Sequence, residues 1–290
     1  MASTGFHEGE VATQRRAGVE RAAQRLENML SAHGLSGGAA QFLATQRFAA
    51  ITGRDREGVL WVSPLSGQPG FLRGAEDTVR ISAVPREGDP LHRMPAGQQV
   101  GLIAIDFAAR RRMRINGSLT ESDGAGLAVR VEQAYGNCPQ YIHRRDINVA
   151  AVTAPSETPR QTTSLSAADQ AMIEASDTFF LGTTHPFRGS DASHRGGPPG
   201  FVRVGSPEML WWPDYPGNNM FNSFGNLAVD DEAALLFVDV ATGASLQLSG
   251  SAEVEWTRPG ADGDDGGVGR RVVFSVGSVV ASGDLGTRAS

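Results

Sequence analysis

The chain has 290 residues, a formal net charge of −6 and an apolar fraction of 40%. This length allows one large domain or two ordinary ones, and the apolar fraction supports a packed core rather than a disordered chain. All 26 basic residues are arginine, which excludes a P-loop lysine and a Schiff-base lysine. A phosphate would therefore be held by arginine, by hydroxyl and amide side chains or by backbone N–H groups. The negative charge argues against a nucleic-acid partner.

The cysteine content and the apolar patterning indicate a soluble, cytoplasmic protein. Cys138 is the single cysteine, so the sequence predicts no internal disulfide and no cysteine zinc site, and a reducing compartment fits. The first 25 residues lack the apolar core of a signal peptide. No stretch reaches the roughly 18 to 20 apolar residues that span a bilayer. We therefore expect no membrane partner.

In chain order, the sequence predicts a helix and then two β-rich halves separated by a polar segment. Residues 10–33 have the pattern of an amphipathic helix that stops at Gly34. A polar linker is expected at 152–166, and a short helix with Ser166 as its N-cap at 166–177. The β-like runs of the first half lie at 47–53, 58–63, 78–84, 100–107 and 112–119. Those of the second half lie at 177–184, 200–205, 209–213, 234–240, 245–256 and 271–280.

The two β-rich halves repeat one another. Residues 63–73, SPLSGQPGFLR, match residues 193–203, SHRGGPPGFVR. Residues 101–119, GLIAIDFAARRRMRINGSL, match residues 234–252, ALLFVDVATGASLQLSGSA, and each copy places an Asp eleven residues before a Gly-Ser pair. Two matches in the same order indicate two copies of one small, barrel-like β domain.

The halves differ most in the loop between the matched blocks. The first copy has AVPREGDPLHRMPAGQQ at 83–99, whereas the second has PDYPGNNMFNSFGNLAVDDE at 213–232. The four asparagines, the serine and the aromatic residues of the second loop suit a ligand with an aromatic system and a polar or phosphorylated tail. Arg195, just upstream, would supply positive charge for a phosphate. The alternative is a long turn whose aromatic residues fill the core.

Four long motifs of the second half are SHRGGPPGFVR, LWWPDYPGNNMFNSFGNL, ALLFVDV and LQLSGSAEVEW. Together they resemble the pyridoxamine 5′-phosphate oxidase-like family, the FMN-binding split barrels. Two further motifs, FHEGE at 6–10 and GNCPQYIHRR at 136–145, resemble a branch in which two such barrels are fused in one chain. In such proteins the flavin lies at the seam between two barrels.

The resemblance implies a cofactor site in the second copy, with the first copy as its partner wall. Arg112 and Arg114, in the basic run 110–114, either face this seam and meet an anionic cofactor or form a solvated strand end. The family's usual loop has Arg and Lys where this chain has Asn and Ser, which leaves deazaflavin and haem open beside FMN. The residues that match the flavin-flanking strand and loop are Ser193, His194, Arg195, Gly196, Asn218, Asn219, Asn222 and Ser223.

These observations predict a mainly β fold, in which tandem split β-barrels with flanking helices form an intrachain pseudo-dimer. The chain would be a pseudo-dimeric monomer or a homodimer. The expected domains are a helical segment at 1–36, a first barrel with a degenerate site at 37–151, a linker and short helix at 152–176, and a second barrel with the main cofactor loop at 177–290.

Three functions remain open from the sequence. The first is an FMN-dependent oxidoreductase of unknown substrate and electron donor, in which the flavin ring carries the redox chemistry. The second is a flavin, deazaflavin or haem binding module without turnover, and the third is a degenerate barrel pair without a ligand. The run ADGDDGG at 261–267 lacks the EF-hand pattern, so we expect no metal there. Metal-ligand spacing is also missing for His7, His33, His92, His143 and His185.

Overall fold

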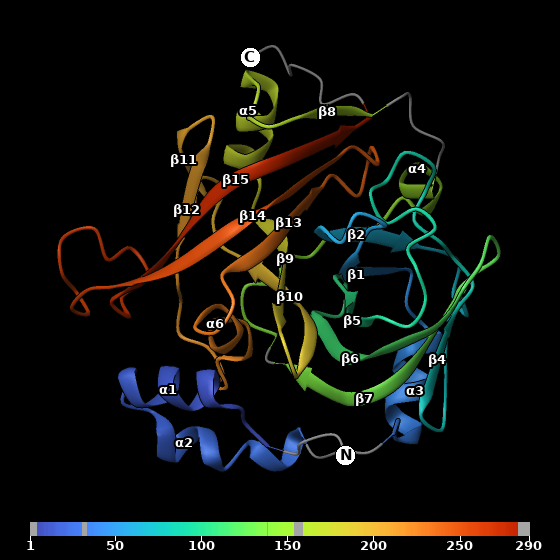
Figure 1. Cartoon of the computed structure of the whole chain (residues 1–290), viewed down its shortest axis with the longest axis horizontal. Coiled ribbons are helices and arrows are strands. Elements are labelled where there is room, and N and C mark those ends of the chain that lie inside the picture. Colours follow the sequence, from blue (N-terminus) through green and yellow to red (C-terminus); the bar gives the residue numbers. More distant parts are fainter. Residues whose placement is uncertain (1–4, 31–33, 138, 154–158, 284–290) are drawn as a thin grey trace.

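The computed structural model describes residues 5–30, 34–137, 139–153 and 159–283. Two antiparallel sheets dominate it, and Figure 1 shows them as two neighbouring β bodies with helices at their ends. No helix in the described ranges is long and apolar enough to cross a membrane.

The first sheet is built from the first half of the chain and has the strand order β2-β1-β5-β6-β7-β4-β3. Its strands and the helix before it are α3 (Gly37–Ala44), β1 (Phe48–Arg54), β2 (Leu60–Ser66), β3 (Leu72–Ala75), β4 (Thr78–Ile81), β5 (Gln99–Asp106), β6 (Arg111–Ser122) and β7 (Leu127–Asn137).

The second sheet repeats this topology with the order β10-β9-β13-β14-β15-β12-β11, and β8 pairs with β15 outside that path. Because each strand has a counterpart at the same place in the first sheet, the predicted tandem of β-barrels is confirmed. The elements are α5 (Ala167–Ala175), β9 (Thr178–His185), β10 (Gly189–Gly196), β11 (Arg203–Ser206), β12 (Met209–Pro213), α6 (Asn222–Leu227), β13 (Glu232–Val238), β14 (Ser245–Trp256) and β15 (Arg270–Ser282).

The connecting segment is more structured than the predicted linker. It contains α4 (Val149–Thr153) and β8 (Arg160–Thr162), and β8 adds to the second sheet through β15. The prediction of Ser166 as a helix N-cap is confirmed, because its hydroxyl accepts the backbone N–H of Asp169 at 3.3 Å. The linker therefore ends as an integral part of the second sheet.

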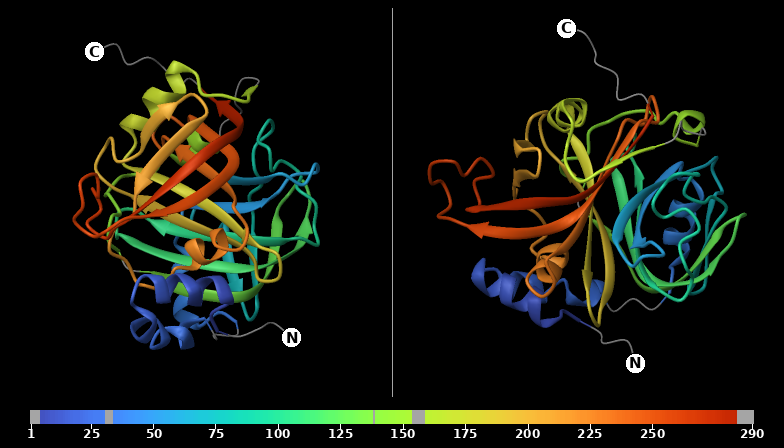
Figure 2. Two further views of the ribbon diagram at one scale, coloured as in Figure 1. Left: turned by 60° about the vertical axis from the view of Figure 1, so that its left-hand side comes forward. Right: turned by 45° about the horizontal axis from the view of Figure 1, so that its top comes forward.

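The N-terminal helix differs from the sequence prediction. In place of one helix at 10–33, the structure has α1 (Glu8–Arg16), α2 (Glu20–Gln24) and a 3₁₀ turn, Glu27–Met29. Gly18 has a φ of 70°, a left-handed conformation that ends α1 and redirects the chain into α2. Residues 31–33 of the predicted helix lie outside the described ranges. Figures 1 and 2 show α1 and α2 across one end of the second barrel, next to α6.

The shared Gly-x-Pro-Gly-Phe stretch, at 67–71 and 197–201, has an architectural role in both barrels. Phe71 and Phe201 each donate a backbone N–H to the carbonyl three residues earlier, at 3.0 and 2.9 Å. A Cβ at Gly67 or Gly197 would lie 2.5 Å from an atom of the corresponding Phe side chain. Only glycine leaves room for these rings, which are buried in their own barrels.

The two barrels pack against each other through a shared apolar core. Residues of β1, β2 and β5 meet residues of β9, β10 and β13 in one buried cluster, which includes Phe48, Ile103, Phe180 and Leu236. Alternate residues of these strands, such as Ile51 in β1, point into the core of their own barrel instead. The strands are therefore buried on both faces, which explains why their sequences are continuous apolar runs.

One end of this seam is closed by a buried polar network. Asp89, from the 83–99 loop, accepts hydrogen bonds from the Ser63 hydroxyl and, at 2.8 Å, from the backbone N–H of Leu91. Gln247 Nε2, on β14, lies 3.1 Å from Asp89 and 3.0 Å from the Val62 carbonyl. Burial raises the pKa of the Asp89 carboxyl to about 6. Gln247 and Ser63 therefore connect the two barrels at this end of the seam. In the sequence repeat, Gln247 corresponds to Arg114, and Ser63 corresponds to Ser193.

We expect Gln247→Ala to destabilise the fold by about 2–4 kcal/mol, because it opens a cavity and leaves a buried carboxylate and carbonyl without their donor. Urea unfolding measures this free energy. Gln99→Ala is the matched control, since Gln99 is exposed on β5 and should cost less than about 0.5 kcal/mol. Equal losses in the two variants would contradict the structural role of Gln247.

Candidate functional site

A pocket lies at the opposite end of the seam, where the first barrel meets the Asn-rich loop of the second. It encloses about 920 Å³ between its lining atoms, counting the part open to solvent. Of the ten site residues predicted from the sequence, those that line it are Arg112, Arg114, His194, Arg195, Gly196, Asn218, Asn219, Asn222 and Ser223.

Ser193 is the one predicted residue that does not line the pocket. It is fully buried on β10, and its hydroxyl oxygen lies 3.1 Å from that of Ser223. Ser223 also donates to Asp191 at 3.1 Å, and Asp191 accepts Arg114 Nη1 at 2.8 Å. Ser193 therefore lies behind the pocket lining and contacts Ser223, which is part of that lining.

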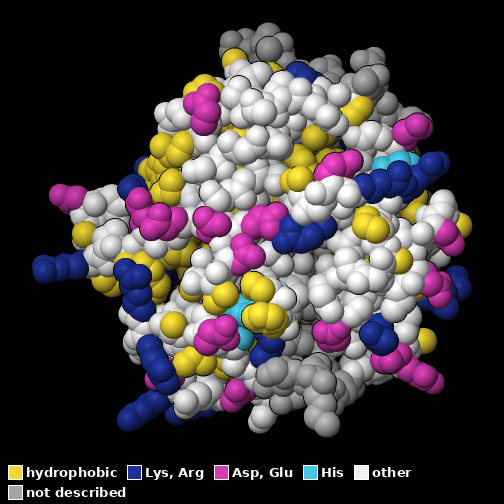
Figure 3. All heavy atoms as spheres, in the orientation of Figure 1, with side chains coloured by type: hydrophobic (Ala, Val, Ile, Leu, Met, Phe, Trp, Pro, Cys, Tyr) yellow, Lys and Arg dark blue, Asp and Glu magenta, His cyan; other side chains and the backbone are white. Residues whose placement is uncertain are grey.

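The pocket is strongly cationic. Its lining includes four arginines, Arg112, Arg114, Arg195 and Arg270, and one carboxylate, Asp214. On the molecular face shown in Figure 3, by contrast, arginine and acidic side chains are interspersed. Several arginines in one partly enclosed site favour an anionic ligand.

Arg195 is only weakly paired within the protein. Its Nε is buried without a hydrogen-bond partner among the described residues, and its ion pair with Asp214 is long, at 3.9 Å. Its guanidinium lies 5.2 Å from the centre of the Phe224 ring. Burial lowers the pKa of Arg195 to about 10, and Asp214 acts in the opposite direction. Asp214 is engaged more closely by Arg270, whose Nε donates to it at 2.9 Å.

His194 has a defined tautomer. Arg112 Nη1 lies 2.7 Å from His194 Nδ1, and because a guanidinium only donates, Nδ1 must be the acceptor. The ring proton therefore sits on Nε2, which is buried and has no partner in the described part of the chain. Burial, followed by the charge of Arg112, lowers the pKa of His194 well below its usual value, so the ring is neutral.

The Asn-rich loop and β12 supply polar and aromatic walls. Asn219 and Phe221 have left-handed φ values of 62° and 61°, after which α6 begins at Asn222. Trp212 lines the pocket, whereas its neighbour Trp211 lies outside the lining and packs against Arg203. The aromatic residues in the lining are Tyr141, Phe201, Trp212, Tyr215, Phe221 and Phe224.

Sequence reasoning missed Tyr141 and Arg270 among the residues that line the pocket. Tyr141, from the segment after the first barrel, stacks on Tyr215 at 5.1 Å between ring centres, so the two halves of the chain meet there. Arg270 is the first residue of β15 and is followed by Arg271. Neighbouring residues of a strand point to opposite faces, so the sequence does not show which of the two arginines faces the pocket. Tyr141 lies in the 136–145 motif, which had signalled the family without assigning a role.

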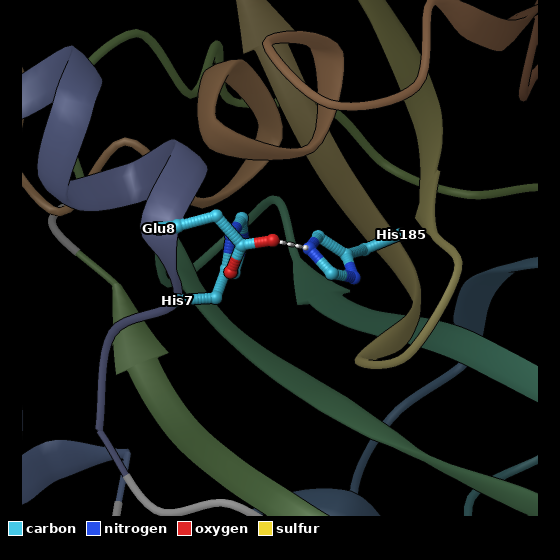
Figure 4. Close-up of side chains that lie close together, drawn as sticks. All are labelled: His7, Glu8 and His185. Carbon is cyan, nitrogen blue, oxygen red and sulfur yellow. Dashed lines mark hydrogen bonds and ion pairs between the residues drawn. The ribbon is translucent and has the colours of Figure 1, made fainter.

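A second cluster, outside the pocket, brings together His7, Glu8 and His185 (Figure 4). Each histidine accepts a backbone N–H at Nδ1, from Gly9 and Phe187 respectively, so each Nε2 carries the proton. These protons go to Asn226 for His7, at 3.1 Å, and to Glu8 for His185, at 3.3 Å. A metal on Nε2 would require the proton to move to Nδ1, against a backbone N–H, so we interpret the cluster as a hydrogen-bonded anchor.

Comparison with solved structures found neighbours of low sequence identity, each of which matches about two fifths of this chain. A putative pyridoxamine 5′-phosphate oxidase from Lactobacillus delbrueckii is 16% identical, has a TM-score of 0.34, and covers 42% of this chain and 97% of its own. The haem storage protein HutZ from Vibrio cholerae is 12% identical, with a TM-score of 0.29 and coverage of 39% and 91%. An F420 reductase is 15% identical, with a TM-score of 0.25 and coverage of 39% and 92%.

A comparison with curated proteins gave no match. Residues 165–263 match the family model described as pyridoxamine 5′-phosphate oxidase. This segment runs from α5 through β14 and carries the strand end, the Asn-rich loop and the helix start that form most of the pocket wall. The second barrel of this chain is thus similar to the pyridoxamine 5′-phosphate oxidase family over these residues.

Proposed function

We propose that the chain binds FMN in the seam pocket and is a flavin-dependent oxidoreductase. The observation that carries the proposal is the pairing of a partly buried, weakly paired arginine with an aromatic wall in one pocket. Arg195 lies with Phe224 and Trp212 in the same lining. A phosphorylated flavin has the complementary features, an anionic group and a flat ring system.

The chain's own residues would bind and orient the cofactor. Arg195, supported by Arg270, would hold the phosphate, and the amides of the Asn-rich loop offer donors and acceptors for a polyhydroxyl chain. The stacked Tyr141 and Tyr215 would add an aromatic surface to the pocket lining. Hydride or electron transfer would be supplied by the flavin ring, so no protein acid–base pair is required.

The state of His194 favours a flavin over haem. A histidine that binds haem iron does so through an unprotonated ring nitrogen while its other nitrogen donates a hydrogen bond. In this pocket Nδ1 already accepts from Arg112 and Nε2 carries the proton. Axial ligation by His194 would therefore require the Arg112 contact to break. A deazaflavin shares the anionic and flat character of FMN and is tested beside it.

The first prediction of this proposal is that one FMN binds per chain, because Asp89 and Gln247 close the equivalent end of the seam. The visible spectrum of the purified protein and a fluorescence titration with FMN measure binding and stoichiometry, with deazaflavin and haemin titrated in parallel. Oxidation of a nicotinamide cofactor by the FMN-loaded protein tests the redox activity. Failure to bind FMN, a stoichiometry of two or preferential haemin binding would refute the assignment.

We also expect Arg195→Ala to weaken FMN binding by about 10- to 100-fold, since it removes a charge-assisted contact with the phosphate. Riboflavin, which lacks the phosphate, should bind the variant about as well as it binds the wild type. Arg203→Ala is the control, because Arg203 is an exposed arginine that packs over Trp211 outside the pocket. An equal loss of affinity for FMN and riboflavin would instead indicate a general collapse of the pocket wall.

A further inference from the structure

The N-terminal helix α1 docks on the ligand-binding loop through polar side chains. His7 Nε2 contacts Asn226 Oδ1 at 3.1 Å, and Gln14 Nε2 donates to the Met220 carbonyl at 3.0 Å. Between them, Glu10 Oε1 accepts a hydrogen bond from Asn222 Nδ2 at 2.5 Å. The spacing of three and four residues places these side chains on one face of the helix. This face of the helix therefore contacts the loop and α6 between Met220 and Asn226.

The two helices approach each other too closely for the contact to be incidental. A Cβ on Gly9 would lie 2.1 Å from the Gly225 carbonyl oxygen, and one on Gly225 would lie 2.6 Å from the backbone N of Glu10. The backbones of α1 and α6 are thus in direct contact, which leaves the Glu10 carboxyl buried between them. At this depth its hydrogen bonds are shielded from water.

Glu10 has two fixed partners, and both donate to it. Oε2 accepts the backbone N–H of His7 at 2.8 Å, which forms a capping box, and Oε1 accepts the Asn222 amide. An ionised carboxylate only accepts, so the Asn222 amide must turn its NH₂ group toward Glu10. Because Asn222 lines the pocket, this contact determines which atoms of the amide remain for a ligand.

The titratable groups that face Glu10 come from several elements. His7 Nε2 lies 3.5 Å away, Arg188 lies in the β9–β10 turn, Asp191 on β10 and Tyr135 on β7. Burial raises the pKa of the Glu10 carboxyl to about 7, whereas the His7 and Asn222 hydrogen bonds and Arg188 act in the opposite direction. Because the shift is upward, the carboxyl is neutral below about pH 7 and ionised above it.

We propose that Glu10 is a positioning residue for the ligand pocket, whose buried carboxylate holds the Asn222 amide in the orientation that binds the ligand. Protonation converts the carboxyl into a donor, which can equally bond to the Asn222 oxygen after the amide turns over. The N-terminal helix thereby makes ligand affinity depend on pH. This inference uses FMN as its probe and to that extent depends on the proposed function.

We expect Glu10→Gln to weaken FMN binding about tenfold at pH 8. The oxygen of the Gln amide must accept the backbone N–H of His7, so its NH₂ group points toward Asn222. The Asn222 amide must then reverse in order to accept this hydrogen bond. Wild-type affinity should fall toward the variant's value as the pH is lowered through about 7. The phosphate of FMN titrates near pH 6 in both proteins, so the difference between them isolates Glu10. Glu8→Gln, on the same turn but largely exposed, should bind within twofold of wild type.

A second pair of variants tests the contact without a ligand, by hydrogen exchange of residues 218–227. Asn222→Asp places two carboxylates together and should lower protection of this segment. Adding Glu10→Gln restores a donor–acceptor pair with reversed polarity, and the double variant should recover protection. If Asn222→Asp keeps wild-type protection, or Glu10→Gln keeps wild-type affinity and pH dependence, the inference is wrong.

If the wild-type protein binds no FMN, the proposed function fails. The exchange experiment then still tests the hydrogen bond between Glu10 and Asn222.

Discussion

The packing of the two barrels through one shared core is the constraint on which the remaining features depend. Strands β1, β5, β9 and β13 each send alternate side chains into their own barrel and into the seam, so they carry almost no polar side chains along the contact. Apolar packing of this kind holds the barrels in a fixed relation. Polar side chains can enter only at the two ends of the seam, where β6, β10 and β14 run beyond the apolar cluster. These ends are where ligands or compensating networks must be located.

The repeat makes the two ends equivalent in backbone, and side chains alone make them different. At one end Ser245 and Gln247 of β14 meet Arg86 and Asp89, so every cation and carboxylate has a partner within the protein. At the other end the equivalent positions are Arg112 and Arg114, and Arg195 stands where the first copy has Leu65. A partly buried arginine without a close partner is more stable when an anionic ligand binds it. The asymmetry thus supports one occupied seam end per chain.

Much of this arrangement could be predicted from the sequence, because local steric or chemical requirements place the same residue types at equivalent positions of the two halves. The Gly-x-Pro-Gly-Phe turns and the matched strands revealed the duplicated topology, and the residues that differ between the copies led to nine residues of one pocket. The closing role of Asp89 and the inward direction of Arg270 depend on which way a loop folds and which face a strand buries. The left-handed conformation of Gly18 likewise depends on where α2 docks. Sequence periodicity does not report these tertiary choices.

The N-terminal helix shows why periodicity misleads in a further way. Its buried residues include Glu10, Thr13 and Gln14, whereas an amphipathic pattern predicts an apolar buried face. An apolar face could slide along α6 by a turn at little cost, but a buried polar group loses its partner if the register shifts. His7, Glu10 and Gln14 therefore restrict the helix to one register on the loop. A polar docking face contributes less hydrophobic free energy but more positional precision, and precision is what a loop that lines a ligand pocket requires.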